Sequence, residues 1–199
     1  MKKLLTVFGI ALVAMVLAVG CKNGDSWGDV DKKTTEIKLT DGDWEYESSG
    51  SSKMLASNCG VMYGIDFSKL DGFIESEEEY SMTFTVSNGK VTMTSEKGSN
   101  STTFPSGADT TPIQAEVTIY SATAEEGEDY SFSGSTAKYK YETPENKLQK
   151  DIPVDDFIDN YLDFYGTFYK NEDGTKYRYY SKRSDGVQNS EAETTLVKQ

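Results

Sequence analysis

Residues 79–93, "EYSMTFTVSNGKVTM", contain the clearest structural pattern in the chain. In the first half of this stretch every second residue is apolar, and the residues between are Ser or Thr. The apolar set is Tyr80, Met82, Phe84 and Val86. The Asn-Gly pair at 88–89 is the strongest short signal for a β-hairpin, and Val91 and Met93 continue the apolar alternation after it. The stretch therefore predicts two antiparallel strands with one apolar face.

The same period of two recurs within residues 37–183. It is found in "DWEYES" (43–48), "AEVTIY" (115–120), "DYSFSG" (129–134) and "AKYKYE" (137–142). Residues 168–180, "FYKNEDGTKYRYY", indicate a further hairpin about a Glu-Asp-Gly turn. Alternation with one polar face is typical of antiparallel strands over a single core. We expect a mainly β domain, either a small antiparallel barrel or a sandwich.

One segment near the carboxyl end has a helical period instead. In residues 153–166 the apolar side chains recur at intervals of three and four, and aspartates occupy the positions between them. Pro153 suits the beginning of a helix and Gly166 its end. The pattern predicts one amphipathic helix that packs on the sheet or plugs one end of a barrel.

The amino terminus has the features of an export signal. Lys2 and Lys3 precede an apolar run at 4–19, which is shorter than the roughly 20 residues that a spanning helix needs. The run ends in "LAVGC" (17–21), which resembles the lipobox of bacterial, spirochaete-type lipoproteins. The resemblance implies cleavage before Cys21, a diacylglyceryl group on its thiol and an added fatty acyl chain such as palmitate. A plain signal peptide or an uncleaved anchor is the alternative.

These patterns divide the chain into four parts. Residues 1–20 are the expected signal peptide, 21–36 a flexible tether, 37–183 the β domain and 184–199 a disordered tail. The expected location is the bacterial cell envelope, on the outer rather than the inner membrane. The membrane, reached through the lipid on Cys21, is the first expected partner.

Composition excludes several classes of function. The formal net charge of −13 makes nucleic acid a poor partner. The chain contains no histidine, which excludes Ser-His-Asp and Cys-His catalysis and histidine-based metal sites. With Cys21 lipidated, Cys59 has no disulfide partner and is expected to be a small buried residue. "STAK" at 135–138 matches the Ser-x-x-Lys of penicillin-binding proteins by chance, because it lies in a strand pattern. We expect no enzyme and no cofactor.

Acidic residues gather in two places. One group is Glu75, Glu77, Glu78 and Glu79, and the other is Glu125, Glu126, Glu128 and Asp129. Paired carboxylates hydrolyse glycosides in some enzymes and bind calcium in others, but neither group has the spacing of a calcium loop. Both groups are interpreted as solvated loops, and no metal site is predicted.

Short motifs in the β domain resemble those of lipocalins. "TDGDWEYE" (40–47) is similar to the opening strand of that family, with Gly42 and Trp44 as its Gly-x-Trp, and "EDY" (128–130) is similar to a second motif. The resemblance implies a lipocalin-like barrel in which a late arginine packs over Trp44. Arg178, on the last predicted strand, is the better candidate for that arginine, and Arg183 is the other.

Two functions remain open. A barrel of about eight strands can hold one small apolar ligand. The side chains expected to line such a cavity, or else to fill the core, are Trp44, Tyr46, Met82, Phe84 and Tyr139. The alternative is a surface or periplasmic lipoprotein with a filled core and no small ligand, which acts by interaction with other proteins or as a structural component.

Overall fold

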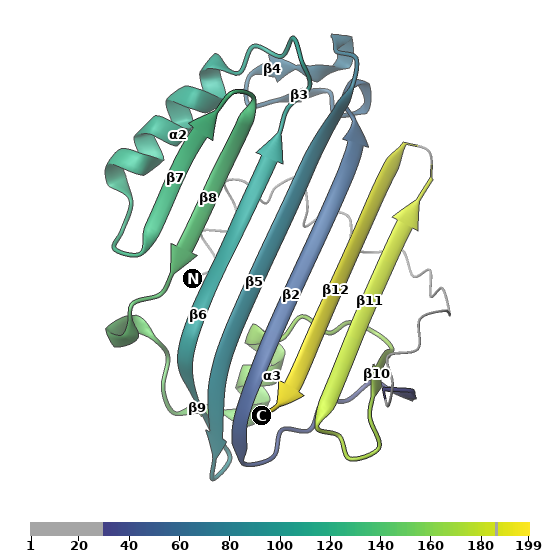
Figure 1. Ribbon diagram of the computed structural model, residues 1–199, viewed down its shortest axis with the longest axis vertical. Helices are drawn as coiled ribbons and strands as arrows, with labels where there is room; N and C mark the ends of the chain where they lie inside the picture. Colours follow the sequence, from purple (N-terminus) through teal and green to yellow (C-terminus); the bar gives the residue numbers. More distant parts are fainter. Residues whose placement is uncertain (1–29, 186) are drawn as a thin grey trace.

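The computed structural model describes residues 30–185 and 187–199. This part of the chain is mainly β: ten strands form one antiparallel sheet, two more form a small hairpin, and two α-helices accompany them (Figure 1). The mainly β, antiparallel prediction is confirmed. The expected signal peptide, Cys21 and residues 22–29 of the tether lie outside the described residues.

The elements follow one another with short connections. The first strands are β1 (Lys32–Thr34), β2 (Gly42–Leu55), β3 (Val61–Met62), β4 (Ile65–Asp66), β5 (Phe73–Ser87) and β6 (Lys90–Thr103). Then come α2 (Thr111–Thr123), β7 (Glu128–Ser133), β8 (Thr136–Glu142), β9 (Ile152–Pro153) and α3 (Val154–Tyr161). The last strands are β10 (Phe168–Lys170), β11 (Lys176–Ser184) and β12 (Gln188–Lys198). Single 3-10 turns occupy Ala56–Asn58, Phe67–Lys69 and Glu145–Lys147.

The large sheet has the strand order β1-β10-β11-β12-β2-β5-β6-β8-β7, and β9 pairs with β6. In this order β1 and β7 are the two ends (Figure 1). The two predicted hairpins are confirmed. Asn88 and Gly89 join β5 to β6 with φ angles of 53° and 74°, the left-handed conformation that Asn-Gly adopts in a tight hairpin turn.

The expected disordered tail is wrong. Residues 188–198 form β12, which lies between β11 and β2 and pairs with both along most of its length. Its inward residue Leu196 is fully buried. The sequence of the tail is polar because the other inward positions of β12 hold small or polar residues, among them Ala192 and Thr194. Such residues fit into a sheet, but they do not give the apolar alternation by which a strand is predicted. Strand β1 likewise occupies part of the expected tether.

The strand predicted at 115–120 is also wrong, because this segment belongs to helix α2. Pro112 lies in the first turn, and Ile113 and Val117, one helical turn apart, are its buried residues. Ile119, which alternation placed in a core, is 61% exposed. Three apolar residues in alternation fit a strand by coincidence. The one predicted helix is confirmed as α3, although it ends at Tyr161 rather than near Gly166.

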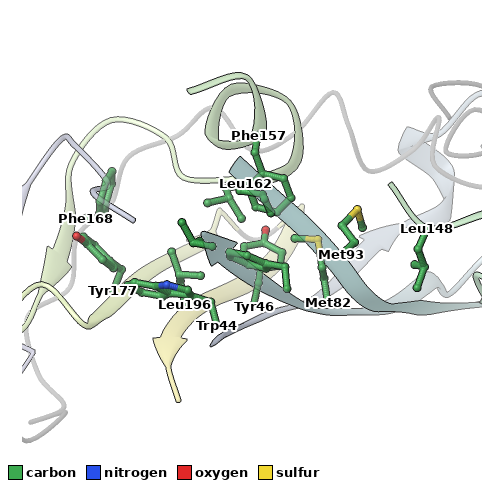
Figure 2. Packing of buried hydrophobic residues seen from close by; sticks show 13 residues of the cluster. Trp44, Tyr46, Met82, Met93, Leu148, Phe157, Leu162, Phe168, Tyr177 and Leu196 are labelled. Carbon is green, nitrogen blue, oxygen red and sulfur yellow. The ribbon is translucent and has the colours of Figure 1, made fainter. Parts of the chain in front are cut away.

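All of the core lies on one face of the sheet, here called the inner face. One group of buried residues, the α3 cluster, packs beneath helix α3 (Figure 2). It consists of Trp44, Tyr46, Met82, Phe84, Val86, Val91, Met93, Leu148, Phe157, Leu162, Phe168, Tyr177 and Leu196. A second group, the α2 cluster, lies toward the opposite ends of the long strands. It consists of Ala56, Ile65, Phe67, Ile74, Phe104, Ile113, Val117 and Ala137. The outer face carries Ser, Thr, Glu and Lys.

Candidate functional site

All five residues predicted to line a cavity or fill the core are buried, and four of them lie together. Trp44, Tyr46, Met82 and Phe84 all belong to the α3 cluster and are at most 1% exposed. Figure 2 shows Phe157 of α3 reaching down toward them, and its ring centre lies 4.6 Å from that of Phe84. Trp44 donates its indole N–H to the Thr40 carbonyl at 2.9 Å. These side chains are therefore packed against other parts of the protein. This agrees with the expectation that they fill the core rather than line a ligand cavity.

Arg178 does not pack over Trp44. It lies on β11 next to Tyr177, and successive side chains of a strand point to opposite faces. Tyr177 takes the inner position, with its ring centre 6.5 Å from that of Trp44. Arg178 lies on the outer face, where its Nε donates to Glu193 Oε1 at 3.1 Å. The other candidate, Arg183, pairs with Asp185 at 2.7 Å.

Tyr139, the fifth predicted residue, lies apart from the other four. It belongs to a row of stacked rings on α2, β7 and β8, here called the tyrosine row: Tyr120, Tyr130, Tyr139 and Tyr141. Successive ring centres in this row are 5.6, 4.4 and 5.7 Å apart. The hydroxyl of Tyr139 donates to Glu128 Oε1 at 3.3 Å. The "AKYKYE" alternation predicted Tyr139 and Tyr141 on one face, but the partners from α2 and β7 come from tertiary packing.

Between the two clusters the inner face is polar, and we call this part the inner belt. Its positions follow from strand register: Ser48, Gly50 and Ser52 on β2; Ser76, Glu78 and Tyr80 on β5; Glu96, Gly98, Asn100 and Thr102 on β6; Tyr139 and Tyr141 on β8; and Ser190, Ala192 and Thr194 on β12. Ten of these fifteen positions are partly buried, and the other five are buried: Ser76, Glu96, Thr102, Tyr139 and Thr194. Hydroxyl pairs such as Ser76 and Thr102, 3.1 Å apart, bond across the strands.

Small residues in the inner belt make room for larger neighbours. The ring of Tyr141 lies over Gly98, where an added Cβ would come within 2.6 Å of the ring atom Cε1. Glu96 is buried nearby and accepts from the hydroxyls of Tyr80, at 3.2 Å, and Thr143, at 2.7 Å. Burial and the charge of Glu96 both raise the pKa of Tyr80, so this phenol is protonated and serves as a donor.

Glu78 is the other carboxylate of the inner belt, and it takes no part in the hydrogen bonds that surround Glu96. It was predicted to lie in a solvated loop, but its group of glutamates is part of strand β5, and alternation turns Glu78 inward. Among the described residues it accepts no hydrogen bond and forms no ion pair. Burial, with a smaller contribution from the charge of Asp163, raises the pKa of Glu78. A polar run such as "ESEEEYS" hides this position, because a loop and a polar strand have the same composition.

The remaining sequence candidates do not assemble into a reactive site. Lys138 of the Ser-x-x-Lys match lies on the outer face of β8, opposite Ser101, and Ser135 is in the turn that precedes this strand. Cys59 is partly buried against the α2 cluster, and burial raises the pKa of its thiol, which makes it a weak nucleophile. Within residues 30–185 and 187–199, no three potential metal ligands gather, and no helix is long and apolar enough to cross a membrane.

Comparison of the chain with models of known protein families, with curated proteins and with solved structures found no match.

Proposed function

We propose that this chain is a non-catalytic lipoprotein of the bacterial envelope that is anchored through Cys21 and presents the inner belt of its sheet to a partner molecule. The observation that carries the proposal is the division of the inner face. Apolar residues fill two clusters at its ends, while half-exposed serines, glycines and tyrosines line the part between them. Five strands contribute positions to that middle part, and most of these positions are only partly buried.

A small apolar ligand inside a lipocalin-like barrel is the less favoured function. It requires the sheet to close, and β1 and β7, which would have to meet, are at the two ends of the strand order. It also requires a cavity, whereas Trp44, Tyr46 and Phe84 are packed against Phe157 and their own neighbours. Interaction through a surface is the function that this packing supports.

The ligand question is tested by fluorescence. Phe replaces Trp27, so that Trp44 is the only indole, and fatty acids or haem are titrated into the protein. We expect no change in the emission of Trp44, because its ring is already enclosed by protein. A saturable change at stoichiometric ligand would show that the core opens, and the proposal of a filled core would fail.

The anchor is tested separately. Cells that express the full chain are grown with radiolabelled palmitate, and the mature amino terminus is analysed by mass spectrometry. We expect a lipidated Cys21 as the first residue, and loss of both the label and the membrane association in Cys21→Ser. An unmodified Cys21 in the mature wild-type protein would refute the anchored lipoprotein.

A further inference from the structure

Lysines lie on only one of the two faces of β2, β5, β6, β7 and β8, whereas carboxylates lie on both. The lysines all occupy outward positions in the register, and they are Lys53, Lys90, Lys97, Lys138 and Lys140. The inward positions hold three carboxylates, Glu78, Glu96 and Glu128, and no Lys or Arg. The inward positions of these five strands therefore carry negative charge and no cationic side chain.

Two of these three carboxylates are satisfied by protein donors. Glu96 accepts from the hydroxyls of Tyr80 and Thr143, and Glu128 accepts from the hydroxyl of Tyr139 and from the backbone N–H of Glu125. Glu78 has neither a donor nor an ion-pair partner among the described residues. A charge that is partly removed from water without a partner is costly, and a cation that reached it would regain that free energy.

The surroundings of Glu78 suit an organic cation. The side chain lies against Gly50, where an added Cβ would stand 3.0 Å from Glu78 Oε1, so the absence of a side chain at this position of β2 makes room for the carboxylate. Tyr80 follows on the same strand and face and is partly exposed, and its ring is held edge-on against the buried ring of Tyr46 at 5.7 Å. Aromatic rings together with a carboxylate are the groups that recognise alkylammonium ions. A metal ion would need further ligands, and no cluster of three is present among the described residues.

We propose that Glu78 and Tyr80 bind the ammonium group of a lysine side chain on a protein partner. The inference rests on the proposed function and deepens it, because it names the chemistry that the inner belt recognises. A lysine on a larger partner is favoured over a free amine, because the inner belt is a half-exposed surface and small ligands are held in enclosing pockets.

The test compares two neighbouring glutamates on opposite faces of β5. The mature chain is prepared as wild type, Glu78→Gln and Glu79→Gln, and a heptapeptide with one central lysine is titrated into each while backbone amide shifts are recorded by NMR. We expect the largest shifts at Glu78, Tyr80 and Asn100. We expect Glu78→Gln to weaken binding by about tenfold, as the loss of one charged contact implies, and Glu79→Gln to leave it unchanged.

Acetylation of the peptide lysine is the second arm, and it needs no variant. It should reduce the affinity for the wild-type protein as much as Glu78→Gln does. Equal binding of the acetylated peptide would overturn the lysine inference and leave the inner belt as a binding surface. Shifts confined to outer-face residues would overturn the proposed function as well. Spermidine that binds as tightly as the peptide would overturn the assignment to a protein partner.

Discussion

The substitution Phe157→Ala tests whether the core beneath α3 is filled and cooperative. Phe157 is fully buried, its ring centre lies 4.6 Å from that of Phe84 and 5.1 Å from that of Tyr161, and it is the only fully buried residue of α3. Truncation of a buried Phe to Ala costs about 3–5 kcal/mol through lost burial and the cavity left behind. This is a large share of the roughly 5–15 kcal/mol that stabilises a domain.

The assay is urea unfolding followed by the fluorescence of Trp44 in a Trp27→Phe background. With a slope of about 2 kcal/mol per molar urea, the midpoint of Phe157→Ala should fall by roughly 2 M. Asp159→Ala, a change at an exposed position of the same helix, is the control. It should change the free energy of unfolding by no more than about 0.5 kcal/mol. If the two variants unfold at the same urea concentration, α3 does not cover the core and the reasoning fails.

Three further changes test other parts of the fold. Gly98→Ala should destabilise the protein by about 1–3 kcal/mol in thermal or urea unfolding, because the new Cβ meets the Tyr141 ring, and an unchanged midpoint would contradict the packing of that ring. Leu196→Ala should cost about 2–5 kcal/mol because this side chain is fully buried, whereas a disordered tail would make the change silent. The native state holds the proton of Glu78 at higher pH than the unfolded chain does, so ionisation of Glu78 lowers stability as pH rises through its raised pKa. The stability of wild type minus that of Glu78→Gln should therefore fall with rising pH, and a flat difference would contradict the desolvation of Glu78.

Strong local signals made much of the fold predictable. The alternation before the Asn-Gly pair identified β5, the hairpin and the inward set that includes Met82 and Phe84. The spacing in 153–166 identified α3 because aspartates marked its exposed side so clearly. In both segments one apolar period, that of a strand in the first and that of a helix in the second, continues for enough residues to exclude the other type of secondary structure.

Sequence reasoning failed where the strands carry no core. Ser52, Glu78 and Ala192 sit on the inner face of central strands, yet their segments are as polar as loops or tails. Pairing with strands far away in the sequence orders these segments, and no local pattern records that. The same limit hid the candidate site, because Glu78 differs from Glu77 and Glu79 only in the face to which register turns it.

Cysteine labelling measures whether the inner belt is a surface open to solvent. In the mature chain with Cys21→Ser and Cys59→Ser, a single cysteine replaces Ser52 of the inner belt, Ser51 of the outer face or the buried Val91. We expect a maleimide to label Ser52→Cys and Ser51→Cys in native buffer, and Val91→Cys only after unfolding. If Ser52→Cys is protected as Val91→Cys is, the inner belt is closed and cannot be the binding surface.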